Sequence, residues 1–98
     1  MATVLLTVEA QKQIDKLPMT IQARMWRIVR RLENWPDVSG AKPLSGELAG
    51  CYRIRTGDYR LQFSIETERV EIEDTKEEKA EYVVLIEKVG HRDGFYGD

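Results

Sequence analysis

The 98-residue sequence is poor in the residues that build disulfide-linked or metal-held folds. It contains one cysteine, Cys51, and one histidine, His91. A single cysteine permits no internal disulfide, and one Cys with one His falls short of the four soft ligands of a structural zinc site. We therefore expect neither a disulfide nor a metal site.

Long hydrophobic runs are also missing. No segment approaches the ~18 consecutive apolar residues of a membrane-spanning helix. Residues 1–6 lack the basic start of a secretory signal peptide, and the acidic Glu9 follows soon after. The sequence therefore predicts no membrane segment. A lone cysteine without an export signal is typical of the reducing cytoplasm, so we expect a cytoplasmic protein.

Composition and charge point to one domain, residues 1–98, with an uneven charge distribution. Hydrophobic residues make up 42% of the chain, enough for a single core. The net charge is −2, and such an average argues against nucleic-acid binding. However, residues 66–81 hold eight acidic and three basic residues, so this segment has a charge of −5 and the remainder +3. The average therefore does not exclude RNA as a ligand.

Hydrophobic spacing in the first half predicts a strand over 4–8, a short helix over 10–17 and a second helix that begins at Thr20 as its N-cap. Apolar residues recur through the second helix at intervals of three and four, as in an amphipathic helix that buries one side. They are Ile21, Met25, Ile28, Val29, Leu32 and Trp35. Since the link between the helices is very short, we expect a helical hairpin.

The second half alternates apolar and polar residues, which is typical of strands. We expect strands over 52–55, 59–65 and 82–86, a tight turn at 56–58 and an irregular tail over 90–98. Residues 41–46 read as a connector, and residues 71–81 as a long solvated hairpin tip. The order β-α-α-β-β-β predicts an α+β fold: a mostly antiparallel sheet with the N-terminal helical hairpin packed on one face.

Three arginines are expected on the open face of this sheet. Arg53 and Arg55 are two positions apart on one strand, and Arg60 alternates with apolar residues on the next. Guanidinium groups bind phosphate through paired hydrogen bonds and keep their charge near neutral pH. The cluster therefore indicates a phosphodiester ligand. The alternative is a solvated face whose arginines pair with Glu or Asp.

The C-terminal segment adds three residues with chemical potential. They are His91, Arg92 and Tyr96. Histidine is the residue type that titrates nearest to neutral pH, arginine can hold a phosphate, and tyrosine can transfer a proton or stack on a base. A single histidine is more often structural than catalytic, so a structural role for His91 stays open at this point.

Several motifs in this order resemble the RelE/ParE superfamily of toxins from type II toxin–antitoxin systems. They are KPL-x-G from Lys42, YRIR-x-GDYR from Tyr52, and VGHR-x₃-Y from Val89 to Tyr96. The resemblance extends over almost the whole chain. It implies the α+β fold and a dedicated antitoxin protein that covers the basic face.

For the RelE-type branch, the resemblance implies a ribosome-dependent endoribonuclease that cuts mRNA without metal or cofactor. The 2′-hydroxyl attacks the adjacent phosphate and leaves a 2′,3′-cyclic phosphate or its 3′-phosphate product. The motifs place Arg60, Arg92, Tyr96 and His91 in the catalytic set, and Arg53 and Arg55 as RNA-binding residues. Because arginine is a poor proton acceptor, proton transfer falls to His91 or Tyr96.

Two other readings remain. ParE-type relatives share the fold but bind and inhibit DNA gyrase, and an inactive toxin-like domain would only bind a partner. The acidic segment is interpreted as a solvated strand tip, and the alternatives are that it masks the basic face or contacts an antitoxin. An acidic overall charge suits a gyrase-type partner better than it suits RNA. On the second predicted helix, Arg24, Arg27 and Arg31 are spaced so that they share a side, which makes them a candidate surface for acidic antitoxin residues. The alternative for these arginines is a solvated helix face.

Overall fold

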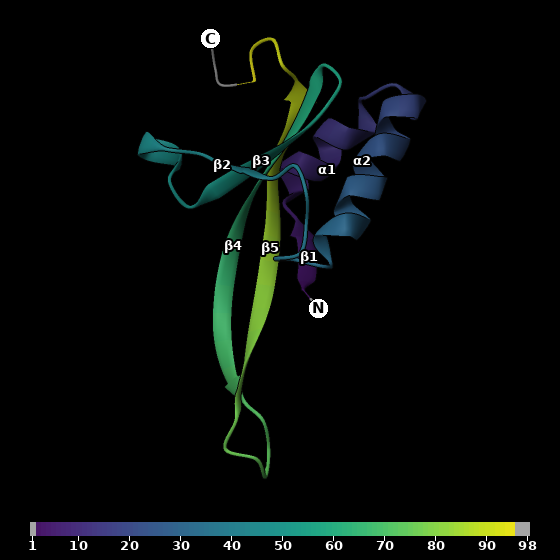
Figure 1. Ribbon diagram of the computed structural model, residues 1–98. Coiled ribbons are helices and arrows are strands. Elements are labelled where there is room, and N and C mark those ends of the chain that lie inside the picture. The colour runs from purple at the N-terminus through teal and green to yellow at the C-terminus, as the bar shows by residue number, and fades with distance from the viewer. Residues whose placement is uncertain (1, 96–98) are drawn as a thin grey trace.

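A computed structural model describes residues 2–95 and shows a five-stranded sheet with two helices (Figure 1). The sheet order is β1-β5-β4-β3-β2. Only the β1–β5 pair is parallel, so the expected mostly antiparallel α+β fold is confirmed. The elements are β1 Thr3–Leu6, α1 Val8–Asp15, α2 Met19–Leu32, β2 Lys42–Pro43, the 3₁₀ turn η1 Gly46–Leu48, β3 Cys51–Thr56, β4 Tyr59–Glu71 and β5 Glu78–His91.

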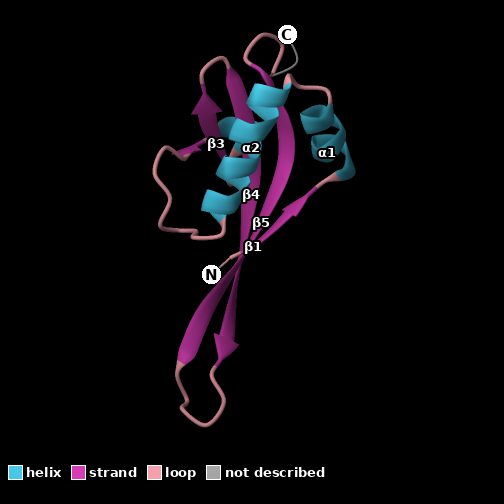
Figure 2. Cartoon of the chain, turned by 90° about the vertical axis from the view of Figure 1, so that its right-hand side faces the viewer, coloured by secondary structure: helices cyan, strands magenta, loops and turns pink. Residues whose placement is uncertain are grey.

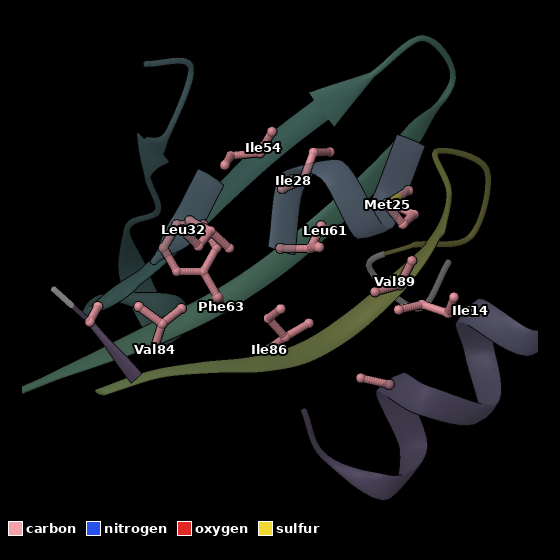
Figure 3. Packing of buried hydrophobic residues seen from close by; sticks show 12 residues of the cluster. Ile14, Met25, Ile28, Leu32, Ile54, Leu61, Phe63, Val84, Ile86 and Val89 are labelled. Carbon is pink, nitrogen blue, oxygen red and sulfur yellow. The ribbon is translucent and has the colours of Figure 1, made fainter. Parts of the chain in front are cut away.

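Both helices lie against the same face of the sheet, and the core fills the space between the two layers (Figure 2). Met25, Ile28 and Leu32 of α2 are buried, as the helical spacing predicted. They meet strand residues such as Leu61 and Phe63, each with an exposed fraction of 0% (Figure 3). In the described chain no helix covers the other face, which we call the open face.

The helix starts differ from the sequence-based expectation. Thr7 is the N-cap of α1, and its hydroxyl accepts a hydrogen bond from Ala10 N at 3.0 Å. Val8, expected in the first strand, is instead the first helical residue. The second helix begins at Met19, not after Thr20, because Pro18 already has a fixed φ of −55° and its carbonyl accepts from Ile21 N at 2.9 Å.

The strands are also longer than expected. β4 runs to Glu71 and β5 begins at Glu78, so residues 71 and 78–81 of the expected solvated tip are paired strand and the loop is limited to residues 72–77. The connector contains β2, which pairs with Tyr52 and Arg53. β5 also includes Gly90 and His91, which were expected in the irregular tail. Main-chain pairing continues wherever a neighbouring strand is present, whatever the polarity of the side chains.

A two-stranded arm, residues 66–81, extends beyond the helices and gives the molecule its long axis (Figures 1 and 2). Nearly all of its side chains are exposed. Glu68 lies directly opposite Glu81, and Glu71 opposite Glu78. Like charges in such positions destabilise a strand pair. The exposed ion pair between Arg69 Nη1 and Glu78 Oε2, at 3.7 Å, offsets little of this repulsion, so the arm depends mainly on its main-chain ladder.

Candidate nucleic-acid interface

Five basic residues share the open face near the β3–β4 turn. The register pairs Arg55 with Arg60, Arg53 with Gln62, and Gln62 with Lys88, and paired residues point to the same side of a sheet. Arg53, Arg55 and Arg60 therefore share one face, as the alternation predicted. We call the following set the basic face: Lys42, Arg53, Arg55, Arg60 and Lys88.

The arginines of the basic face lack carboxylate partners. No ion pair within residues 2–95 involves Arg53, Arg55 or Arg60, so the alternative of arginines neutralised by Glu or Asp is not what the structure shows. Arg55 and Arg60 even stand directly opposite each other, an arrangement that costs stability. A bound anion would remove that repulsion.

Arg53 carries a second sign of an unfilled site. Its Nε atom is buried and has no hydrogen-bond partner in the described structure. A buried donor without a partner costs about 1–3 kcal/mol. On the same face, the paired Gln62 side chain is also buried, with an exposed fraction of 8%. The middle of the basic face therefore contains polar groups that are shielded from solvent.

Arg92 is held at the end of the sheet by the β3–β4 turn. Its backbone N donates to the Asp58 carbonyl at 2.7 Å, and its Nη1 lies 3.7 Å from Asp58 Oδ1. The Nε atom is 3.8 Å from Asp93 Oδ1. The turn thus brings Arg92 to the same end of the molecule as Arg55 and Arg60. The Arg92 guanidinium differs from those of Arg55 and Arg60 because it lies within ion-pair distance of the Asp58 and Asp93 carboxylates.

His91 does not join the three arginines. It pairs with Tyr59, so its side chain lies on the helix side of the sheet, and the two rings form an edge contact with centroids 5.2 Å apart. Its Nδ1 accepts a hydrogen bond from Asp93 N at 3.1 Å and lies 3.5 Å from Asp93 Oδ2. His91 therefore lies away from Arg53, Arg55 and Arg60, although it shares the Asp93 carboxylate with Arg92.

The chain after β5 turns toward the open face (Figure 1). Phe95 is buried, with an exposed fraction of 2%, and a Cβ atom on Gly90 would lie 3.6 Å from its ring. The ammonium of Lys88 is 4.8 Å from the centre of the same ring. Phe95 therefore anchors the segment that leads to Tyr96. Tyr96, expected in the catalytic set, lies outside the described residues.

A family model described as the ParE toxin of the type II toxin–antitoxin system parDE matches residues 4–94. The chain belongs to the RelE/ParE superfamily of type II toxins. A curated relative, toxin RelG of Mycobacterium tuberculosis (strain ATCC 25618 / H37Rv), is 31% identical over 94 residues, which are 96% of this toxin and 94% of RelG.

Two solved structures share the fold of this toxin. One is a chain of the RelBE2 toxin–antitoxin complex from Mycobacterium tuberculosis, with a TM-score of 0.68 and 32% identity over 93% of the toxin and 98% of that chain. The other is the isolated RelE toxin of E. coli, with a TM-score of 0.63 and 19% identity over 93% of this toxin and 84% of that chain. The second similarity concerns the fold alone.

Lys88, Gly90 and Phe95 also belong to the toxin's open face, which the sequence pattern did not predict. A β-bulge opposite Gln62 and Phe63 explains why. Ile86 and Val89 are three residues apart yet both are buried, which breaks the two-residue alternation. The spacing of Ile86 and Val89 was the available signal for the bulge. Phe95 had no such signal, because its ring packs beside Gly90 only once the chain has turned after β5.

Within residues 2–95, no three His, Cys, Asp or Glu side chains converge as metal ligands. Neither helix of the described chain has the length and apolar character needed to cross a membrane. Cys51 lies beside the open face, where its Sγ contacts Glu87 Oε1 at 3.5 Å. Burial raises the pKa of the Cys51 thiol, and the Glu87 charge and this hydrogen bond raise it further. The thiol therefore stays protonated more readily than an exposed cysteine.

Proposed function

We propose that this toxin is a ribosome-dependent endoribonuclease that cleaves mRNA in the cytoplasm and thereby inhibits translation. The observation that carries the proposal is the basic face, where three arginines share one side of the sheet and form no ion pair in the described part of the chain. Such a surface suits a phosphodiester, which guanidinium groups bind through paired hydrogen bonds. The resemblance of the motifs to RelE-type toxins supports the same activity.

The proposed reaction takes place on the ribosome and needs no metal or cofactor. The 2′-oxygen forms a bond to phosphorus while the bond from phosphorus to the 5′-oxygen breaks. A base takes the proton of the 2′-hydroxyl, and an acid gives a proton to the departing 5′-oxygen. Arg60 and Arg92 hold the reacting phosphate, and Arg53 and Arg55 stabilise the backbone and the charge that develops in the transition state.

Proton transfer is assigned to Tyr96 or His91, because arginine stays protonated. The position of His91 on the helix side of the sheet favours Tyr96. Under this assignment, Tyr96→Phe lowers the cleavage rate more than His91→Ala does. Equal and large losses in both variants would instead show that the His91 ring reaches the RNA in the complex.

The proposed partner of the toxin is a cognate antitoxin protein that covers the basic face. The RelBE2 structure is described as a toxin–antitoxin complex, and the toxin aligns with 98% of one of its chains. Open-face arginines without partners in the described chain would gain carboxylate partners in such a complex. Co-expression of the antitoxin should restore growth when the toxin is induced.

The central experiment measures mRNA cleavage on purified ribosomes. The double variant Arg60→Ala with Arg92→Ala should lose ~10²–10³-fold in rate or more, the typical cost of removing one charge-stabilising donor. The matched control is Arg69→Ala, which removes an exposed arginine from the arm and should cleave at the wild-type rate. Undiminished cleavage by the double variant would remove Arg60 and Arg92 from the site.

Gyrase inhibition is the second candidate function, because the matched family model is that of the ParE toxin. A supercoiling assay with purified toxin and gyrase separates the two. Under the endoribonuclease proposal, supercoiling continues at molar excess of the toxin, and ribosome-bound mRNA is cut. Inhibited supercoiling together with intact mRNA would reverse the assignment. A toxin that binds antitoxin but is inactive in both assays would be the third, inactive reading.

A further inference from the structure

A second basic feature lies around the edge of the sheet, between α2 and β3. It is a cleft of about 220 Å³. Four arginines line it together with Ile28 and Thr56: Arg24, Arg27, Arg31 and Arg55. Sequence analysis identified the three helix arginines as a candidate docking surface. The structure adds Arg55 from the strand, and so connects this surface to the basic face.

The charges in this cleft are not neutralised by the toxin's own carboxylates in residues 2–95, where none of the four arginines forms an ion pair. Arg31 donates to the Ser39 carbonyl at 2.7 Å, a neutral partner. The Arg24 Nη1 atom lies against the β3–β4 turn, 3.6 Å from where a Cβ of Gly57 would be. Four cations around one hollow repel one another, so they favour an anionic occupant.

The strand that borders the cleft has an unpaired edge. β2 pairs only with Tyr52 and Arg53, so from Ile54 to Thr56 the outer edge of β3 has no strand neighbour in the described chain. Such an edge presents alternating N–H donors and C=O acceptors, which fit the main chain of an added strand. The buried Ile28 at the cleft wall supplies an apolar contact. Edge, charge and apolar contact together suit a peptide better than a nucleic acid.

We propose that the cleft binds an extended acidic peptide segment, which adds a strand to the edge of β3 and places its carboxylates among the four arginines. The identification of this segment as part of the antitoxin rests on the proposed function. The binding mode itself does not.

The proposed mode has a consequence for the basic face. Arg55 lines the cleft and also stands directly opposite Arg60. An acidic segment that pairs with Arg55 would compete with RNA for its guanidinium. Neutralisation of the toxin would then begin at the edge of the sheet and would not require the whole basic face to be covered.

The test uses the full-length toxin and two labelled probes, an octapeptide of alternating Val and Glu and an eight-nucleotide single-stranded RNA. Fluorescence anisotropy gives the Kd of each. The variant Arg24→Ala with Arg27→Ala should weaken peptide binding at least tenfold and change RNA binding less than twofold. The charge-matched control, Lys12→Ala with Arg30→Ala, removes two exposed cations that do not line the cleft and should change both less than twofold.

Hydrogen exchange on the wild-type toxin supplies a second readout that needs no variant. The added strand should slow exchange of the Arg55 amide when the peptide is present, and a lysine-containing peptide should leave it unchanged. Absence of peptide binding, absence of protection, or equal weakening in the variant and its control would each overturn the proposal. Loss of RNA binding in the cleft variant with unchanged peptide binding would assign the cleft to RNA instead.

These outcomes are separable from those of the proposed function. Peptide binding with no mRNA cleavage by the wild-type toxin would leave the cleft proposal intact and refute the endoribonuclease. Cleavage of mRNA without peptide binding would support the endoribonuclease and refute the cleft proposal.

Discussion

At the scale of single residues, the Gln13 side chain accepts a hydrogen bond from a β5 amide that has no neighbouring strand to bond to. β1 pairs with β5 only as far as Ile86, and beyond that point α1 borders the strand. The amide of the buried Val89 donates to Gln13 Oε1 at 2.7 Å. The side chain of a helix thus replaces a missing neighbouring strand and satisfies a main-chain donor that would otherwise be buried without a partner.

We expect Gln13→Ala to lower the free energy of unfolding by about 1–3 kcal/mol, the cost of a buried donor left without a partner. Denaturant unfolding followed by circular dichroism measures the change. Gln11→Ala is the matched control, because that side chain bonds Asp15 in an exposed position, and its effect should stay below about 0.5 kcal/mol. Equal stability of both variants would show that water replaces the Gln13 contact.

Cys51 offers a residue-scale test of the electrostatics beside the open face. Since burial and Glu87 raise the thiol pKa, less reactive thiolate is present at any pH below that pKa. Alkylation by iodoacetamide between pH 7 and 9 should therefore be slower in the folded toxin than in denaturant. Glu87→Gln removes the charge but leaves the burial, so its rate should fall between these two. Identical rates for the wild type and Glu87→Gln would contradict the charge contribution.

At the scale of elements, the spacing of apolar residues predicted which side of each helix and strand is buried. The alternation around Arg60 placed Leu61 and Phe63 in the core, and the helical spacing did the same for Met25. The shared face of Arg53, Arg55 and Arg60 was predictable for the same reason, because alternate residues of a strand point to the same side of the sheet.

Features that depend on which segments pair or pack in three dimensions were not predictable from the pattern within one strand. The extension of β4 to Glu71 depends on pairing with Glu78, and two facing glutamates give no local indication of a strand. The side of the sheet that His91 occupies depends on its pairing with Tyr59. The contact of the Phe95 ring with Gly90 depends on the turn that the chain makes after β5.

The arm provides the element-scale prediction. Replacing residues 71–78 with Asn-Gly would connect Val70 to its register partner Lys79 through a favourable two-residue turn. No core residue lies in the removed segment, so the free energy of unfolding should change by less than about 0.5 kcal/mol. Thermal and denaturant unfolding measure this change. A much larger loss would show that the arm stabilises the body of the toxin.

At the scale of the whole molecule, distance separates the two regions of opposite charge. The arm's end at Glu71 is eleven residues along β4 from Arg60, which at ~3.3 Å per residue is roughly 36 Å. Electrostatic screening acts over about 8 Å at 0.15 M salt and about 30 Å at 0.01 M. The acidity of the arm therefore reaches the basic face only at low salt. The formal charge of −2 describes neither end of the molecule.

This separation predicts how the truncated arm changes RNA binding. The replacement removes five acidic residues and one basic residue, so the net charge moves from −2 to +2. For an eight-nucleotide RNA, the Kd should change less than about twofold at 0.15 M salt and should fall several-fold at 0.01 M. A control of full length with the same net charge separates charge from bulk: Glu73→Gln, Asp74→Asn, Glu77→Gln and Glu78→Gln combined. It should match the truncated toxin at both salt concentrations. If only the truncated toxin binds RNA more tightly at 0.15 M, the arm physically obstructs the basic face. A purely electrostatic effect of the arm would be the same in the truncated toxin and in the full-length charge variant, because both have the same net charge.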